Sequence, residues 1–393
     1  MFNHRHLWGF VSVVESGNLS RAAGHLHISQ PALSQGVGKL ERQLGLPLLD
    51  RTGATLVPTS PGQLLHDRVV SAGRHLENGA RETGVSLPVL QNFSHAQLRI
   101  FIAVVGSGRF KEAATALGLD TSTVNRTFRQ FEQRIGIKAL ERTTNGIQPT
   151  RAATILERHI KLALLEFHFA IEDIAHWRGQ FSGRIEIGSV PLFQAHVLPE
   201  AIRRFSDEFP KVTIAVVDGF YDQLARQLLH GKIDLFLSAM RGTSAPPEIR
   251  EVTLFTEQLI AVTRKEHPLA DKAGTSTRDL LKFPFVAPQK GAPARAYFDR
   301  LVAEGDPNST ALAPIETSNP AMVRSILCNS DRIAFISSSV QVSQELSEGV
   351  LKRLDVRLSQ SDRQMGYAYR RDFQLTLAQE RFAEILQDVM GTT

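Results

Sequence analysis

The chain has 393 residues, of which 42% are apolar, and its formal net charge is +5. This composition excludes an intrinsically disordered chain and predicts two or three packed domains. A single cysteine, no apolar signal segment at the start and no run of roughly eighteen apolar residues exclude a disulfide framework and predict a cytoplasmic protein without a membrane partner.

The positive charge is concentrated in the front of the chain. Residues 1–60 contain five basic and three acidic residues, and residues 93–151 contain nine basic and four acidic ones. Residues 180–393 have a net charge of −1. Basic segments ahead of a near-neutral body favour a polyanionic partner for the front part.

The first 27 residues predict two helices. Leu7, Phe10 and Val14 recur at helical spacing within residues 3–16. Ser20 is expected to cap the second helix, "RAAGHLH", by accepting a hydrogen bond from a free backbone N–H group.

A third helix and a β-wing follow. Ser29 is the expected N-cap of this helix, Pro31 suits its first turn, and Gly45 suits a left-handed C-terminal residue. The segment "LLDRTGATLVPTS" then predicts two short strands around a turn containing Gly53. Together these elements predict a winged helix-turn-helix unit over residues 1–60.

In such a unit the second helix of the pair enters the major groove of DNA. The polar face of the third helix consists of Gln30, Ser34 and Gln35, whose side chains can bond to base edges. Ser29, Pro31 and Arg51 complete the expected DNA-binding set, with Ser29 and Arg51 suited to phosphates. The alternative is that these polar residues only solvate a surface helix.

A second copy of this unit is predicted over residues 93–150, after a helix and connector over residues 61–92. A shift of 91 positions aligns identical residues of the two copies, including Leu7 with Leu98, Phe10 with Phe101, Glu41 with Glu132, Gly45 with Gly136 and Arg51 with Arg142. The framework is retained, so the second copy is expected to fold in the same way.

The reading segment differs between the copies, because "SQPALSQ" is replaced by "DTSTVNR". The second copy offers Thr121, Thr123, Asn125 and Arg126, and Arg142 on its wing, as candidate DNA contacts. Asn can bond to adenine and Arg to guanine. Two hypotheses remain for this unit: a working DNA reader, or a spacer or dimerisation module.

Residues 151–179 predict one long helix with an apolar stripe that includes Ile155, Leu162, Leu165, Phe169 and Ile174. Such a stripe is typical of a packing seam. We interpret it as a linker and dimerisation helix, and the alternative is a helix that packs within the chain.

From residue 183 strands alternate with helices, which predicts an α/β domain over residues 180–393. We expect two lobes: lobe 1 from about 183 to 265 and from 341 to 393, and lobe 2 from about 266 to 340. The fold class is therefore multidomain: two mainly α winged helix-turn-helix units, a long helix and a two-lobed α/β domain.

No catalytic motif is present, so we expect neither an enzyme nor a cofactor. His4, His6, His25 and His27 are interpreted as scattered histidines and not as metal ligands, and Cys328 as an inert thiol.

Sheets of this kind bind ligands beyond the carboxyl ends of their strands. The candidate ligand-binding residues at such ends are Ser189, Val190, Pro191, Ser238, Met240, Gln289, Ser318 and Asn319. Hydroxyls and helix N-termini suit an anionic or hydroxylated small molecule. The alternative is that each of them only forms an ordinary turn.

The stretch "FVSVVESGNLSRAAGHLHISQPALSQGVGKLERQLGLPLLDRT" resembles the DNA-binding domain of LysR-type transcriptional regulators. The remainder is similar to the periplasmic-binding-protein-like effector domain of that family. The resemblance implies a homodimer or homotetramer that binds double-stranded promoter DNA and responds to a small-molecule effector, with RNA polymerase as a candidate partner. It also places Ser29, Gln30, Pro31, Ser34 and Gln35 at DNA-contacting positions, and Ser189, Ser238 and Ser318 near the effector.

The chain departs from this family in two ways. Gly36 and Gly38 weaken the reading helix by about 0.5–1 kcal/mol each, so this helix is expected to tighten on DNA. An ordinary member also lacks the second winged unit. "IGSVPLFQAHVLPEAIRRF" is similar to a branch with regulators of sugar-binding-protein and protocatechuate genes. Rival functions are a cytoplasmic solute-binding protein and a scaffold whose winged units bind protein.

Overall fold

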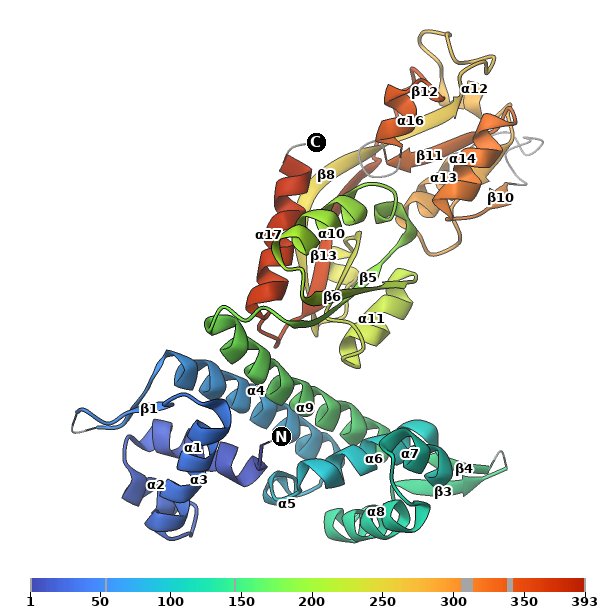
Figure 1. The fold of residues 1–393 in the computed structure, drawn as a ribbon. Coiled ribbons are helices and arrows are strands. Elements are labelled where there is room, and N and C mark those ends of the chain that lie inside the picture. The colour runs from blue at the N-terminus through green and yellow to red at the C-terminus, as the bar shows by residue number, and fades with distance from the viewer. Residues whose placement is uncertain (1, 54, 145, 305–313, 338–341, 392–393) are drawn as a thin grey trace. The chain divides into compact units, whose positions relative to one another are not determined.

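A computed structural model describes residues 2–53, 55–144, 146–304, 314–337 and 342–391 of the chain. The chain forms two compact units, residues 1–181 and 182–393 (Figure 1). The N-terminal unit is almost wholly helical, and the C-terminal unit is α/β.

The first winged unit has the predicted three helices and wing. Ser29 caps the third helix by accepting a hydrogen bond from the Ala32 N–H at 3.4 Å, and Gly45 ends it with a φ of 65°. The elements are α1 (His4–Ser16), α2 (Leu19–His25), α3 (Gln30–Leu44), β1 (Leu49–Asp50) and β2 (Val57–Pro58).

The predicted cap of α2 is wrong. Asn18, in an extended conformation, precedes the helix, and its side-chain oxygen accepts from the N–H groups of Ser20 at 2.8 Å and Arg21 at 3.1 Å. Ser20 therefore lies inside α2, and its hydroxyl donates to the Gln30 Oε1 at 3.1 Å.

The second winged unit repeats the first, including a hydrogen bond that joins the third helix of each unit to the segment before its wing. The Glu41 carboxylate accepts from the Leu48 N–H at 3.0 Å, and Glu132 accepts from the Ala139 N–H at 2.8 Å in the equivalent place. The elements are α6 (His95–Ser107), α7 (Phe110–Leu117), α8 (Thr121–Ile135), β3 (Leu140–Thr143) and β4 (Gly146–Pro149). A short helix, α5 (Leu87–Gln91), occupies the predicted connector.

Two long helices, α4 (Ser60–Thr83) and α9 (Arg151–Trp177), pack against each other within the chain. Their buried seam consists of Leu65, Val69, Ala72 and Leu76 from α4 and Leu156, Ile160, Ala163 and Phe167 from α9. The seam of α9 therefore lies on a face neighbouring the predicted stripe, of which Ile174 alone belongs to this core. The difference arises because α9 is apolar over much of its circumference, so the stripe could be drawn on more than one face. The face in this core is covered by α4 of the same chain, as in the alternative of a helix that packs within the chain.

A buried polar cluster crosses this seam. The Arg68 guanidinium donates to Asp173 at 2.7 Å and to Glu166 at 3.1 Å, and all three side chains are at most 5% exposed. Charge-assisted hydrogen bonds of this kind offset the cost of removing the ions from water. The cluster thus fixes the register of α4 on α9.

Lobe 1 of the C-terminal unit is a sheet in the order β8-β13-β7-β5-β6, in which β8 spans Ile249–Arg264, with helices packed on it. The strands β6, β5 and β7 are parallel, and β13 and β8 are antiparallel to their neighbours. Its elements are β5 (Gly183–Ser189), α10 (Val197–Glu208), β6 (Val212–Asp218), α11 (Tyr221–Leu229), β7 (Leu235–Ala239), β13 (Asp362–Arg370) and α17 (Leu377–Gly391).

Lobe 2 is built on the second half of the long strand β8 (Ile249–Arg264), which pairs there with β11 and β12. Its other elements are α12 (Thr277–Leu280), β9 (Phe285–Ala287), α13 (Pro293–Ala303), β10 (Ile315–Glu316), α14 (Pro320–Cys328), β11 (Ile333–Ser337), α16 (Ser343–Ser347) and β12 (Leu351–Arg353).

The structure moves both lobe boundaries. Leu259, Leu354 and Leu358 belong to the core of lobe 2, so the chain enters this lobe before residue 265 and leaves it only after residue 358. The reason is that β8 is shared by both sheets and that β12 returns to it. The predicted boundary at 340 and 341 falls outside the described residues.

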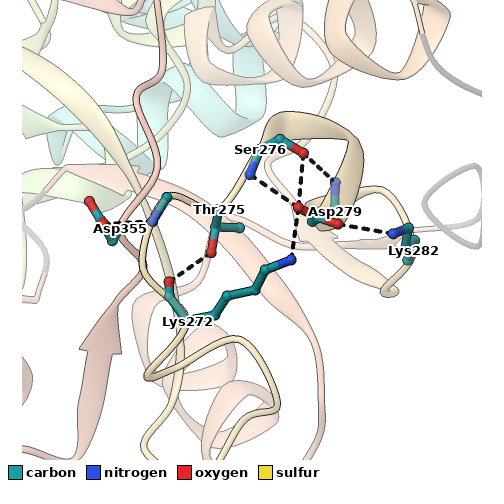
Figure 2. Close-up of polar contacts among 7 residues, drawn as sticks. Lys272, Thr275, Ser276, Asp279, Lys282 and Asp355 are labelled. Carbon is teal, nitrogen blue, oxygen red and sulfur yellow. Dashed lines mark hydrogen bonds and ion pairs between the residues drawn. The ribbon is translucent and has the colours of Figure 1, made fainter.

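A cluster of polar contacts surrounds the start of α12 in lobe 2 (Figure 2). The Asp279 carboxylate accepts from Lys282 at 2.9 Å, from Lys272 at 3.1 Å and from the Ser276 hydroxyl at 2.9 Å, and these hydrogen bonds hold its pKa well below the usual range. The Gly274 N–H donates to Asp355 at 2.9 Å, which joins the segment before α12 to the segment after β12.

Replacing Arg68 should strongly destabilise the N-terminal unit. We expect Arg68→Ala to lower its free energy of unfolding by about 3–5 kcal/mol, because two carboxylates stay buried without their counter-ion. Both tryptophans, Trp8 and Trp177, lie in this unit, so urea unfolding followed by tryptophan fluorescence reports on it alone. The matched control, Arg109→Ala in an exposed ion pair, should cost less than about 1 kcal/mol. Equal losses would contradict the assignment.

Acid should destabilise the same unit through His4 and His95. Burial lowers the pKa of each to about 4, below the ordinary histidine value of 6.5. The unfolded chain therefore binds more protons, and stability is lost as the pH falls from 6.5 towards 4. For the buried His4 the loss is about 2 kcal/mol near pH 5. Urea unfolding of His4→Gln should show a shallower pH dependence than the wild type, and an unchanged slope would refute this.

Candidate nucleic-acid interface and ligand cleft

The polar face of α3 is exposed opposite a buried apolar face. Gln30 and Gln35 are exposed and Ser34 is half-buried, whereas Leu33 and Val37 lie in the core. Ser29 and Pro31 are exposed at the start of the helix. The Ser20 hydroxyl holds the Gln30 amide, which orients one candidate reading side chain before any ligand is bound.

Gly36 has a packing role in α3. A Cβ atom on Gly36 would lie 3.1 Å from the His6 ring, so the absence of a side chain lets α1 approach. Burial and the neighbouring Lys39 lower the pKa of His6. The helix is continuous through Gly36 and Gly38, and its tightening on DNA stays a prediction.

Arg51, on the first wing, is half exposed and forms an ion pair with Glu41 at 3.0 Å. A phosphate would have to compete with this carboxylate for the guanidinium. Its counterpart Arg142 is exposed on β3.

The corresponding helix of the second winged unit, α8, also presents polar side chains. Thr121, Asn125 and Arg126 are exposed and Thr123 is half-buried. Asp120 occupies the N-cap position without a side-chain hydrogen bond to the helix. Chemically, this face offers an amide and a guanidinium at the positions where α3 offers Ser34 and Gln35.

Among the described residues, no group of three or more His, Cys, Asp or Glu side chains is arranged to hold a metal ion. Nor does any helix in that part of the chain combine the length and hydropathy needed to cross a membrane.

A cleft of about 130 Å³, partly open to solvent, lies in the C-terminal unit between elements of its two lobes. Four of the predicted ligand-binding residues line it: Val190, Pro191, Ser238 and Ser318. Val190, Pro191 and Ser318 follow the ends of β5 and β10, and Ser238 lies within β7 next to its last residue, so all four lie at ends of strands as expected for this class of sheet.

The other four predicted residues do not line the cleft. Ser189 is fully buried and donates to the Val190 carbonyl at 3.0 Å, while Asn319 caps α14 through the Met322 N–H at 3.0 Å. The Gln289 N–H donates to the Ser318 hydroxyl at 3.2 Å. The Met240 N–H donates to the Gln364 carbonyl at 2.8 Å. Residues adjacent to these four in sequence line the cleft.

Sequence reasoning missed the cations of the cleft, Arg241, Lys290 and Arg363. Arg241 directly follows the end of the third strand of lobe 1, so its position in the chain was a usable signal. Arg363 lies at the start of β13, far from the other cleft segments in sequence, and no local pattern marks it. Within the described part of the chain, Asp222 is the one acidic residue in the lining that contains these three cations.

Three buried polar atoms on cleft residues lack a hydrogen-bond partner among the described residues: Ser238 Oγ, Arg241 Nε and Arg363 Nε. Buried groups of this kind are rare in folded proteins and call for a partner. Burial also lowers the pKa of Arg363 to about 10, with only Glu257 opposing the shift. The cleft therefore has an unsatisfied capacity to donate to an anion.

Arg241 also connects the lobes. Its guanidinium donates to the Gly291 carbonyl of lobe 2 at 2.9 Å and lies 4.8 Å from the centre of the Tyr221 ring. The Tyr221 hydroxyl donates to Glu251 at 2.9 Å, and its burial raises the pKa of the phenol. A ligand that binds to Arg241 would thus bind to a side chain that already joins the two lobes.

Comparison with known families gives matches to both units. Residues 4–63 and 95–154 each match the family described as bacterial regulatory helix-turn-helix protein, lysR family, and residues 178–391 match the LysR substrate binding domain.

Individual proteins are similar over most of the chain. The HTH-type transcriptional regulator GalR of Pseudomonas putida is 28% identical, over 92% of this chain and 90% of that protein. The regulator PcaQ of Agrobacterium fabrum is 24% identical, over 77% of this chain and 96% of its own length. A full-length OxyR variant from Pseudomonas aeruginosa, a solved structure, aligns with a TM-score of 0.58 at 17% identity over 76% of this chain and 95% of that one, which shows likeness of fold.

Removing the Ser238 hydroxyl should not destabilise the ligand-free C-terminal unit. We expect Ser238→Val to leave its free energy of unfolding unchanged or raised by up to about 1 kcal/mol, because an unpaired buried hydroxyl is removed. The matched control is Ser361→Val, since the buried Ser361 donates to the Leu358 carbonyl at 2.8 Å, and it should cost about 1–3 kcal/mol. Urea unfolding followed by circular dichroism separates the two, and a comparable loss for both would show that Ser238 is satisfied.

Proposed function

The chain belongs to the LysR family of DNA-binding transcriptional regulators, and from this premise we propose which of its surfaces bind DNA and which class of ligand controls it. It is a regulator with an effector-binding domain and not an enzyme, and regulators of this family bind DNA and small-molecule effectors and form oligomers. The rival functions of solute binding and protein scaffolding are therefore set aside.

We propose that α3 of the first winged unit reads base edges in the major groove. The exposed row of Gln30, Ser34 and Gln35 supports this, because amide and hydroxyl groups can bond to bases without adding charge. Ser29 and Arg51 would bind phosphates on either side, and Thr121, Thr123, Asn125, Arg126 and Arg142 are the corresponding candidates in the second unit. RNA polymerase is the partner through which a regulator bound near a promoter would act.

The effector proposed for the cleft is a small carboxylate or other anion, and hydroxyl groups on it would suit Ser238 and Ser318. The observation that carries this is the set of three unpaired donors, Ser238 Oγ, Arg241 Nε and Arg363 Nε, in a cleft with excess positive charge. An anion bound there would satisfy both guanidinium groups with charge-assisted hydrogen bonds.

Effector binding would act through the contact between lobes. Arg241 reaches from lobe 1 to Gly291 of lobe 2, so an anion that draws this guanidinium inward changes how the lobes close on β8. Regulation requires that the effector binds one closure state more tightly than the other, since equal affinity would shift no equilibrium.

Removing the Gln30 amide should relax base preference. We expect Gln30→Ala to lose about 1–3 kcal/mol of discrimination at one base pair, because the alanine cannot bond to a base edge. Salt-dependent binding to random DNA should persist, since it depends on phosphate contacts. Sequencing of DNA selected by the full chain measures both. Gln63→Ala, on the exposed surface of α4, is the control, and an unchanged preference in Gln30→Ala would contradict the role of Gln30.

Neutralising Arg363 should weaken anion binding in the cleft. Titration calorimetry with protocatechuate, other small carboxylates and their neutral amides should show binding of acids over amides, and Arg363→Gln should lower the affinity for the acids about tenfold. The remote, exposed Arg226→Gln should bind like the wild type. Amides that bind as tightly as acids would exclude an anionic effector.

A further inference from the structure

The seam between α4 and α9 consists of equivalent residues of the two repeats. Four buried pairs differ by the same 91 positions that relate the winged units: Leu65 and Leu156, Val69 and Ile160, Ala72 and Ala163, and Leu76 and Phe167. The duplication therefore extends beyond the winged units into the long helices, and the two copies of the long helix are each other's packing partner.

The contacts across this seam are reciprocal. Arg68 of α4 bonds to Asp173 of α9 at 2.7 Å, and His159 of α9 lies 3.0 Å from Glu82 of α4. His159 is the counterpart of Arg68, and Asp173 is the counterpart of Glu82, at the shift of 91. When residue i of one copy contacts j of the other and j contacts i, the copies are related by a two-fold axis.

Residues on such an axis meet their own counterparts, and two pairs do so. His75 lies 3.8 Å from Glu166, which is its counterpart in α9. The rings of His4 and His95, counterparts in α1 and α6, lie 5.6 Å apart between centroids. Along α4, the residues Arg68, His75 and Glu82 contact Asp173, Glu166 and His159 of α9 in that order. Residue numbers rise along one helix while they fall along the other, so α4 and α9 run antiparallel.

This pseudo-two-fold also relates the reading helices α3 and α8. The winged units lie at opposite ends of the α4–α9 pair, with their wings pointing outward (Figure 1). One hydrophobic core runs through both winged units and both long helices, so their arrangement is that of a single packed body. Helix-turn-helix dimers present two reading helices in this two-fold manner to half-sites about one helical turn apart.

We propose that a single chain carries both halves of a two-fold DNA reader and binds both half-sites of one duplex. This rests on the proposed DNA binding and goes beyond it, because it makes the second winged unit a reader and not a spacer. The net charge of +5 over residues 93–151, against +2 over residues 1–60, favours phosphate binding by the second unit at least as strongly as by the first.

The two half-sites differ in sequence because the reading helices differ. Ser34 of α3 corresponds to Asn125 of α8, and Gln35 corresponds to Arg126. Gln pairs with adenine and Arg with guanine, so equivalent positions of the two half-sites should prefer A·T in one and G·C in the other. The partner is thus an asymmetric operator, whereas two identical readers would require a palindrome.

Base selection by the full chain tests this proposal. Wild type, Gln35→Ala and Arg126→Ala are each allowed to select from random duplexes, with Gln63→Ala and Arg226→Ala as controls of the same residue types away from the reading helices. Gln35→Ala should lose about tenfold discrimination in one half of the selected site only, and Arg126→Ala in the other half only. Both positions are exposed, so folding is not at issue.

A palindromic site that Gln35→Ala relaxes in both halves and Arg126→Ala leaves unchanged would overturn the proposal, since each half would then be read by the first unit of a different chain. Two variants that alter the same base pairs would also overturn it. If the wild type selects no sequence at all, the proposed DNA reading by α3 has failed as well, which is a different outcome.

Discussion

The arginine buried between two carboxylates is the constraint on which the N-terminal unit depends. Arg68, Glu166 and Asp173 are each removed from water, and each is tolerable only while the other charges are within hydrogen-bonding distance. Sliding α4 along α9 would leave a buried charge unpaired, whereas the apolar seam alone would tolerate several registers. The ionic cluster therefore selects one register, and the continuous core carries that choice outward to both winged units.

A second constraint, the sharing of β8, organises the C-terminal unit. One strand belongs to both sheets, so the lobes are joined by backbone hydrogen bonds on each side of their boundary. Side chains at that boundary, such as Arg241 and Arg363, are brought to the cleft from distant parts of the sequence. The same arrangement leaves their Nε groups without partners among the described residues, and this is the basis of the proposed anionic effector.

The elements of the winged units could be predicted from sequence because their signals are local. Ser29 and Gly45 cap α3 through bonds to residues within one or two turns, and the structure has both caps where the sequence predicts them. The repeat at 91 positions is recognised from identical residues alone. Prediction failed where several residues compete for one local role, as when Asn18 and not Ser20 caps α2. In the cleft, Ser238 and Ser318 were predicted because they lie at or just after the ends of strands, and Arg363 was missed because its own strand reaches the cleft only through pairing with β8.

The sequence by itself determined two winged units, a two-lobed α/β domain, the polar faces of α3 and α8 and the resemblance to LysR-type regulators. All of these follow from periodicity, caps and repeats, which depend on neighbouring residues. Only the tertiary structure decided that α9 packs on α4 of its own chain, because a helical stripe shows that a partner is needed without identifying it. That identity depends on the pairing of Arg68 with carboxylates about a hundred positions away, a contact that burial makes decisive and that no local pattern contains.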